Sequence, residues 1–215
     1  VVPCFWAGGS TFKLRYQAME AGEYHVSFQV ARGSLDLQEA SCSFQVSEQA
    51  SEVSFLLHGG PVVSDNGRHL VSSFSKEPFF WLADSWWFGM SSRIDDTIFD
   101  QLTRDRAEKG FSVIQFALGF ACDIEPYDSR DANDAGHIWE PDYQTINPAY
   151  FEQTDRRIAK LVAQGLVPNV VGMWGYYLPY LGREKAKLHW RYLIARYGAL
   201  PVNWTLCGEA RLIWY

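Results

Sequence analysis

Carboxylate and aromatic residues follow four short apolar segments of this sequence, at the points where those segments end. Asp84 closes the first segment, Cys122-Asp123-Ile124-Glu125 follows the second, and Glu209 follows the fourth. The third runs into the aromatic stretch at residues 174–177. In parallel α/β proteins, ligands bind beyond the carboxyl ends of the strands. These positions therefore form the candidate functional site.

Glu209 is the candidate catalytic residue. It follows the apolar residues 202–206, and Gly208 directly before it permits close backbone packing. A carboxyl group in a partly dry pocket can stay protonated and donate its proton to a leaving oxygen. The alternative is a structural role, in which Glu209 pairs with Arg211.

Flat aromatic rings at the strand ends are suited to stacking on a sugar, and polar groups beside them could bind its hydroxyls. The candidate substrate-binding residues are Asp84, Trp86, Trp87, Gln115, Trp174, Tyr176, Tyr177, His137 and Trp139. Asp84 could instead cap a helix or form a salt bridge, and each aromatic could belong to the core. His137 and Trp139 lie in residues 121–146, a connection long enough to indicate a functional loop.

Composition argues against several classes of protein. A net charge of −6 disfavours nucleic acid and anionic membrane surfaces as partners. No segment approaches the roughly 20 apolar residues of a membrane span. The histidines lack metal-ligand spacing, and Cys4 and Cys42 could either bridge two strands or remain free thiols.

The first 60 residues predict short strands with period-two alternation, typical of an antiparallel sandwich. The predicted strands are residues 12–16, 24–30, 42–46 and 53–57. The Asn66-Gly67 pair then predicts a hairpin over residues 61–74.

Beyond the hairpin, apolar segments alternate with amphipathic ones, which predicts a parallel sheet covered by helices. Asp95 or Asp96 is expected to cap the first helix and Asn147-Pro148 to open the second, and Gly198 is expected to end the third. A full (β/α)₈ barrel takes about 250 residues, so we expect only its first half, β1 to about β4. The alternative is a complete doubly wound sheet, although the first strand lacks a glycine-rich phosphate turn.

Five motifs together resemble the apiosidase-like glycoside hydrolase family, whose barrel often follows an immunoglobulin-like domain. They are Asn66-Gly67-Arg68-His69-Leu70, Pro78-Phe79-Phe80-Trp81-Leu82-Ala83-Asp84, Asp105-Arg106-Ala107-Glu108-Lys109-Gly110-Phe111, Asn147-Pro148-Ala149-Tyr150-Phe151 and Ala195-Arg196-Tyr197-Gly198-Ala199. The fold class expected is thus multidomain: an N-terminal immunoglobulin-like β-sandwich over residues 1–60, incomplete at its start, and a C-terminally truncated TIM barrel over residues 61–215.

The resemblance implies a secreted or periplasmic bacterial enzyme that cleaves glycosidic bonds in plant or other complex polysaccharides, without metal or organic cofactor. Glu209 matches the position of the family's acid/base, while the nucleophile lies on a later strand, beyond this chain. A retaining mechanism needs both carboxylates. We therefore expect the fragment alone to be inactive, and to self-associate through exposed strand edges.

The alternative function is a non-catalytic carbohydrate-binding or adhesive module, in which the sandwich and aromatic rings hold a saccharide without cleaving it. Both hypotheses give an oligo- or polysaccharide as the partner, and neither involves nucleic acid or a membrane span.

Overall fold

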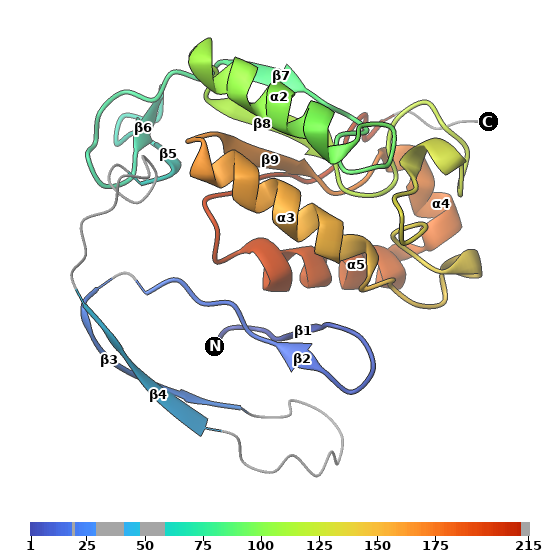
Figure 1. The fold of residues 1–215 in the computed structure, drawn as a ribbon, viewed down its shortest axis with the longest axis horizontal. Helices are drawn as coiled ribbons and strands as arrows, with labels where there is room; N and C mark the ends of the chain where they lie inside the picture. Colours follow the sequence, from blue (N-terminus) through green and yellow to red (C-terminus); the bar gives the residue numbers. More distant parts are fainter. Residues whose placement is uncertain (19, 29–40, 48–58, 212–215) are drawn as a thin grey trace.

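A four-stranded parallel sheet organises the chain, which the computed structural model describes over residues 1–18, 20–28, 41–47 and 59–211 (Figure 1). Its strands run in the order β10-β9-β8-β7. They are β7 (Ala83–Ser85), β8 (Val113–Ala117), β9 (Val167–Val171) and β10 (Asn203–Thr205), joined by α2 (Asp96–Glu108), α3 (Tyr150–Ala163) and α5 (Arg183–Tyr197). Crossovers between neighbouring parallel strands are right-handed as a rule, and with strands in sequential order this rule puts all three helices on one face of the sheet.

The local signals of the sequence explain where these elements begin and end. Asp95 caps α2, since its Oδ1 accepts a hydrogen bond of 2.7 Å from the backbone N–H of Ile98. The Asn147 side chain accepts from the N–H of Ala149 just before α3, and Gly198 ends α5. The apolar runs became β8 and β9, whose residues are almost all buried. The predicted alternation of parallel strands and helices is confirmed.

The antiparallel strands form separate pairs. β1 (Phe5–Trp6) pairs with β2 (Phe12–Lys13), β3 (Gly22–Ser27) with β4 (Ser41–Val46), and β5 (Pro61–Val63) with β6 (Leu70–Ser72). The last pair confirms the hairpin predicted from Asn66-Gly67.

The predicted fold class, an immunoglobulin-like sandwich followed by the first half of a (β/α)₈ barrel, is wrong. The described chain is an α/β protein with a four-stranded parallel sheet and short antiparallel pairs. No residue of β3 or β4 is buried, because a two-stranded ribbon has no facing sheet to cover it. The predicted strand over residues 53–57 lies outside the described residues. The domain boundary near residue 60 stays a prediction.

The first strand packs against α5. The Phe5 ring is 2% exposed and meets the Tyr192 ring edge-on, with the ring centres 6.1 Å apart. Asp155 of α3 binds both Arg15 and Arg196. Burial alone would raise the pKa of Asp155, but its hydrogen bonds from the two arginines outweigh burial and lower it. The start of the chain is thereby tied to both α3 and α5.

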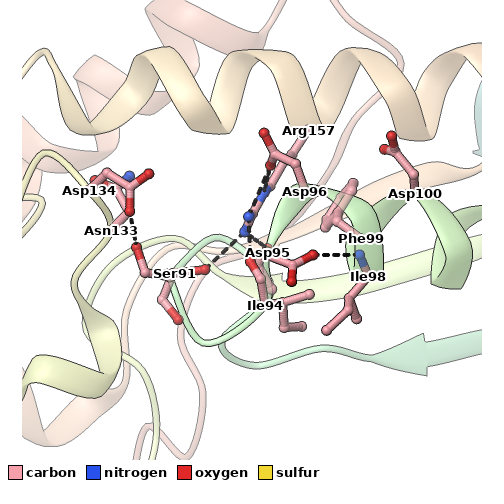
Figure 2. Close-up of polar contacts among 12 residues, drawn as sticks. Ser91, Ile94, Asp95, Asp96, Ile98, Phe99, Asp100, Asn133, Asp134 and Arg157 are labelled. Carbon is pink, nitrogen blue, oxygen red and sulfur yellow. Dashed lines mark hydrogen bonds and ion pairs between the residues drawn. The ribbon is translucent and has the colours of Figure 1, made fainter.

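A buried arginine of α3 holds the loop between β7 and α2 (Figure 2). The Arg157 side chain is fully buried, and its Nη1 donates to the carbonyls of Gly89 and Ser91 at 2.8 and 2.9 Å. Its Nη2 donates to the Ile94 carbonyl, and its Nε to Asp96 at 3.1 Å. Every part of this guanidinium therefore has a partner, which is the condition for burying a charge.

A buried histidine connects the long loop after β8 to the helices. His189 of α5 lies with Nε2 2.8 Å from the Gly172 carbonyl, and its Nδ1 accepts from the indole N–H of Trp139 at 3.2 Å. The proton of the neutral ring must therefore sit on Nε2. Burial lowers the pKa of His189 to about 4, against the opposing effect of the carbonyls of Gly172 and Leu118.

Among the described cysteines, Cys4 and Cys42 are exposed free thiols, whereas Cys122 is buried. Within the described ranges, the helices all fall short of the length and apolar character needed to cross a membrane.

Arg157→Met should lower the free energy of unfolding by about 3 kcal/mol or more, because three carbonyls and Asp96 lose their charged donor. Urea unfolding measures the effect. The matched control is Lys160→Met, which removes an exposed ion pair with Asp100 and should cost less than about 1 kcal/mol. Equal losses in the two variants would contradict the role given to Arg157.

The lowered pKa of His189 predicts a pH dependence of stability. Below pH 6.5 the imidazole of His189 is protonated in the unfolded chain but stays neutral in the folded chain. The free energy of unfolding therefore falls from pH 6.5 towards pH 4. His189→Gln should flatten this slope in denaturant titrations, whereas the same change at the exposed His69 should not. Identical slopes for both variants would show that His189 is charged in the folded protein.

Candidate active site

The chain segments that follow β9 and β10 stay paired beyond the strands. Trp174 and Gly208 form an isolated parallel bridge, the N–H of Gly175 donates to the Gly208 carbonyl at 2.9 Å, and the N–H of Gly208 donates to Met173 at 3.0 Å. This pairing brings Glu209 beside Trp174. Glu209 has φ of 47°, in the left-handed region that costs energy for a residue with a side chain.

The Glu209 carboxylate is held by a tryptophan. Its Oε2 accepts a hydrogen bond of 2.9 Å from the indole Nε1 of Trp174. Glu209 is exposed, so the partly dry pocket expected from the sequence is not present in this chain. Within the part of the chain that the structure describes, Glu209 forms no ion pair, and the alternative pairing with Arg211 is not observed.

Close packing between Trp174 and Gly208 fixes this geometry. A Cβ atom at position 208 would lie 2.5 Å from Cε2 of the Trp174 ring, a distance that no side chain can occupy. The indole is 5% exposed, and the Trp87 ring meets it edge-on with centres 5.0 Å apart. Trp87 and Trp174, two of the predicted substrate-binding residues, are thus brought together with Glu209.

Asp84 and Trp86 face the helices instead. Oδ2 of Asp84 accepts hydrogen bonds from the Trp86 indole at 2.9 Å and from Nε of Arg106, in α2, at 2.6 Å. Burial would raise the pKa of Asp84, but these two hydrogen bonds outweigh it and lower the pKa. The Trp86 ring packs against Phe99 of α2. The structure places both residues in the contact between β7 and α2.

Gln115 belongs to a row of polar side chains that crosses all four strands. Its Oε1 accepts from Nδ2 of Asn169 at 2.6 Å, and its Nε2 reaches Ser85 Oγ at 3.4 Å. Asn169 also donates to Thr205 Oγ1 at 3.1 Å. Side chains alternate along a strand, so this row lies on the face opposite Asp84, away from the helices. Gln115 lies in this row, without a direct contact to Glu209.

The other predicted residues belong to the long loop and its supports. Tyr177 is 1% exposed and donates to the Ile124 carbonyl at 2.9 Å, and Trp139 is 2% exposed. These two pack as core residues of the loop. His137 is half-buried and meets Tyr127 edge-on, and burial lowers its pKa. Tyr176 lines a pocket between the loops that follow β8 and β9.

Sequence reasoning placed Cys122 at the end of the second strand without giving it a role, and it missed Asp131. Burial raises the pKa of the Cys122 thiol, and the nearby carboxylates of Asp123 and Glu209 raise it further. Asp131 is half-buried as a residue, but its carboxyl group is enclosed, which raises its pKa to about 7 despite hydrogen bonds from the backbone of Ala121 and Phe120. Both depend on how the long loop closes, and no local sequence signal marks that closure.

Gly208→Ala should destabilise the protein by about 1–3 kcal/mol, because the added methyl displaces the Trp174 ring. Thermal unfolding measures the loss, and tryptophan fluorescence reports the displaced indole. Gly60→Ala is the matched control, since the nearest atom to its new methyl would be 3.9 Å away. A variant at 208 as stable as that control would contradict the packing described.

Comparisons with known proteins identify the family. Residues 64–213 match the model of the apiosidase-like catalytic domain. No curated protein is significantly similar to this chain in sequence.

Two solved structures from Bacteroides vulgatus share the fold. One, assigned as a glycoside hydrolase, has a TM-score of 0.72 and 17% identity over 97% of this chain and 42% of its own. The other, from glycoside hydrolase family 5, has a TM-score of 0.58 and 21% identity over 69% of this chain and 32% of its own. This chain thus spans less than half the length of either structure. Because the family match extends over residues 64–213, the chain belongs to the apiosidase-like catalytic domain family.

Proposed function

We propose that this chain is part of a glycosidase that cleaves glycosidic bonds in complex polysaccharides, with Glu209 as its acid/base. The observation that carries the proposal is the hydrogen bond from Trp174 to Glu209, at the carboxyl ends of two neighbouring parallel strands. Family membership and the fold shared with glycoside hydrolases support it.

Glu209 would act first as an acid. Its carboxyl group donates a proton to the glycosidic oxygen while the bond from that oxygen to the anomeric carbon breaks. In a retaining mechanism a second carboxylate, roughly 5–5.5 Å away, attacks the anomeric carbon from the opposite side. Glu209 then removes a proton from the water that releases the sugar. The indole of Trp174 supports this cycle by orienting the carboxylate in its ionised form.

We place the second carboxylate outside these 215 residues. The support is that 97% of this chain aligns with only 42% of the glycoside hydrolase structure from Bacteroides vulgatus. The chain by itself then binds saccharide without appreciable hydrolysis. We further propose that the complete enzyme acts outside the cytoplasm, where large polysaccharides are available to it.

In the full-length protein, Glu209→Ala should lower kcat/KM for a natural oligosaccharide by about 10²–10⁴-fold. Hydrolysis of a dinitrophenyl glycoside should be largely spared, since this leaving group departs without a proton. The control is Glu108→Ala, at the last residue of α2, which should leave both activities unchanged. Equal losses on the two substrates would reject the acid role, and unchanged hydrolysis of both would reject Glu209 altogether.

A further inference from the structure

A pocket of about 250 Å³ lies between the loops that follow β8 and β9. Its lining includes Asp123, Ile124, Glu125, Arg130, Tyr176 and Tyr180. Asp123, Ile124 and Glu125 belong to the segment after the second strand that the sequence singled out, Tyr176 was a predicted substrate-binding residue, and Arg130 and Tyr180 were not predicted. The pocket combines carboxylates, a guanidinium and aromatic rings, which is the mixture of groups that binds sugars.

Tyr176 builds the floor of the pocket and fixes its shape. It is 7% exposed, and its hydroxyl donates to the Ala121 carbonyl at 3.2 Å. The same oxygen accepts hydrogen bonds from the backbone N–H groups of Asp123 and Ile124. Asp123 has φ of 56°, so this tyrosine stabilises a turn that would otherwise be unfavourable. The Asp123 carboxylate is thereby presented at the rim.

The charges around the pocket are predominantly negative. Arg130 is held by Asp128, with Nε–Oδ1 and Nη2–Oδ2 distances of 2.9 and 2.6 Å, and this contact lowers the pKa of Asp128 to about 2. The charge of Arg130 is therefore already balanced. Within the described ranges, the carboxylates of Asp123 and Glu125 have neither a hydrogen-bond partner nor an ion-pair partner. They are available as acceptors for hydroxyl groups, and they repel anions.

The pocket lies next to the chain segment that carries Glu209. Gly175, directly before Tyr176, lies so close to the last strand that a Cβ atom on it would be 3.0 Å from the Glu209 carbonyl. Trp174, two residues before Tyr176, donates a hydrogen bond of 2.9 Å to the Glu209 carboxylate. A saccharide that reaches Glu209 can therefore extend into the pocket.

We propose that this pocket is a binding subsite for an uncharged sugar unit, adjacent to the glycosidic bond that Glu209 protonates. This inference rests on the proposed function for the position of the bond. Asp123 and Glu125 accept hydrogen bonds from neighbouring hydroxyl groups, and the Tyr180 ring, 56% exposed, stacks on the sugar. A uronic acid unit is excluded by the two unpaired carboxylates.

The test is saccharide binding by this chain, followed by isothermal titration calorimetry, with cellobiose, xylobiose and mannobiose as neutral probes and digalacturonate as the anionic probe. At least one neutral disaccharide should bind. Asp123→Asn should weaken that binding at least tenfold, and asparagine keeps the left-handed backbone favourable. Tyr180→Ala, at an exposed ring, should weaken it by a similar factor. Asp65→Asn, at an exposed residue of the β5–β6 turn, is the matched control and should have no effect.

Three results would overturn the subsite: no binding of any neutral disaccharide, affinities unchanged by both pocket variants, or digalacturonate binding as tightly as the neutral probes. Glu209→Gln separates this inference from the proposed function. It should leave disaccharide affinity within about threefold while it abolishes hydrolysis by the full-length protein. Retained hydrolysis in that variant would reject the proposed function, whereas the binding results alone decide the subsite.

Discussion

The indole of Trp174 is the contact on which the candidate site depends. One face covers Gly208, its N–H binds Glu209, and its ring meets Trp87. Gly208 and Glu209 are consecutive residues and Trp87 lies far from them in the sequence, yet all three are positioned by one rigid side chain. Interiors pack too tightly for such a ring to shift alone, so the carboxylate and the aromatic surface beside it are fixed together.

Buried polar side chains extend this rigidity to the loops. Arg157 fixes the loop that carries Trp87, and His189 fixes the long loop after β8 through Trp139. Each is fully buried, and each exchanges hydrogen bonds with water for bonds to protein groups. Loops without regular structure can hold a site in place when such anchors satisfy their backbone carbonyls.

Local patterns predicted the elements, and contacts between distant segments decided the rest. The cap at Asp95 and the turn at Asn66-Gly67 depend on a few neighbouring residues, so the sequence alone predicts them. Whether strands form a sandwich depends on a second sheet, and Phe5 packs on α5 instead. For Asp84 the sequence left a substrate-binding role and a salt bridge open, and the structure shows the salt bridge with Arg106, because side chains alternate between the two faces of a strand.

The Asp155 carboxylate binds two arginines, and this limits which substitutions the protein can accept. Arg15 reaches it from the start of the chain and Arg196 from the end of α5, while Phe5 rests against Tyr192. Replacing the opening segment by that of another protein would leave the half-buried Asp155 without Arg15 and would uncover the Tyr192 ring. The opening segment and this helix are therefore expected to be inherited as a unit, with compensating replacements on both sides.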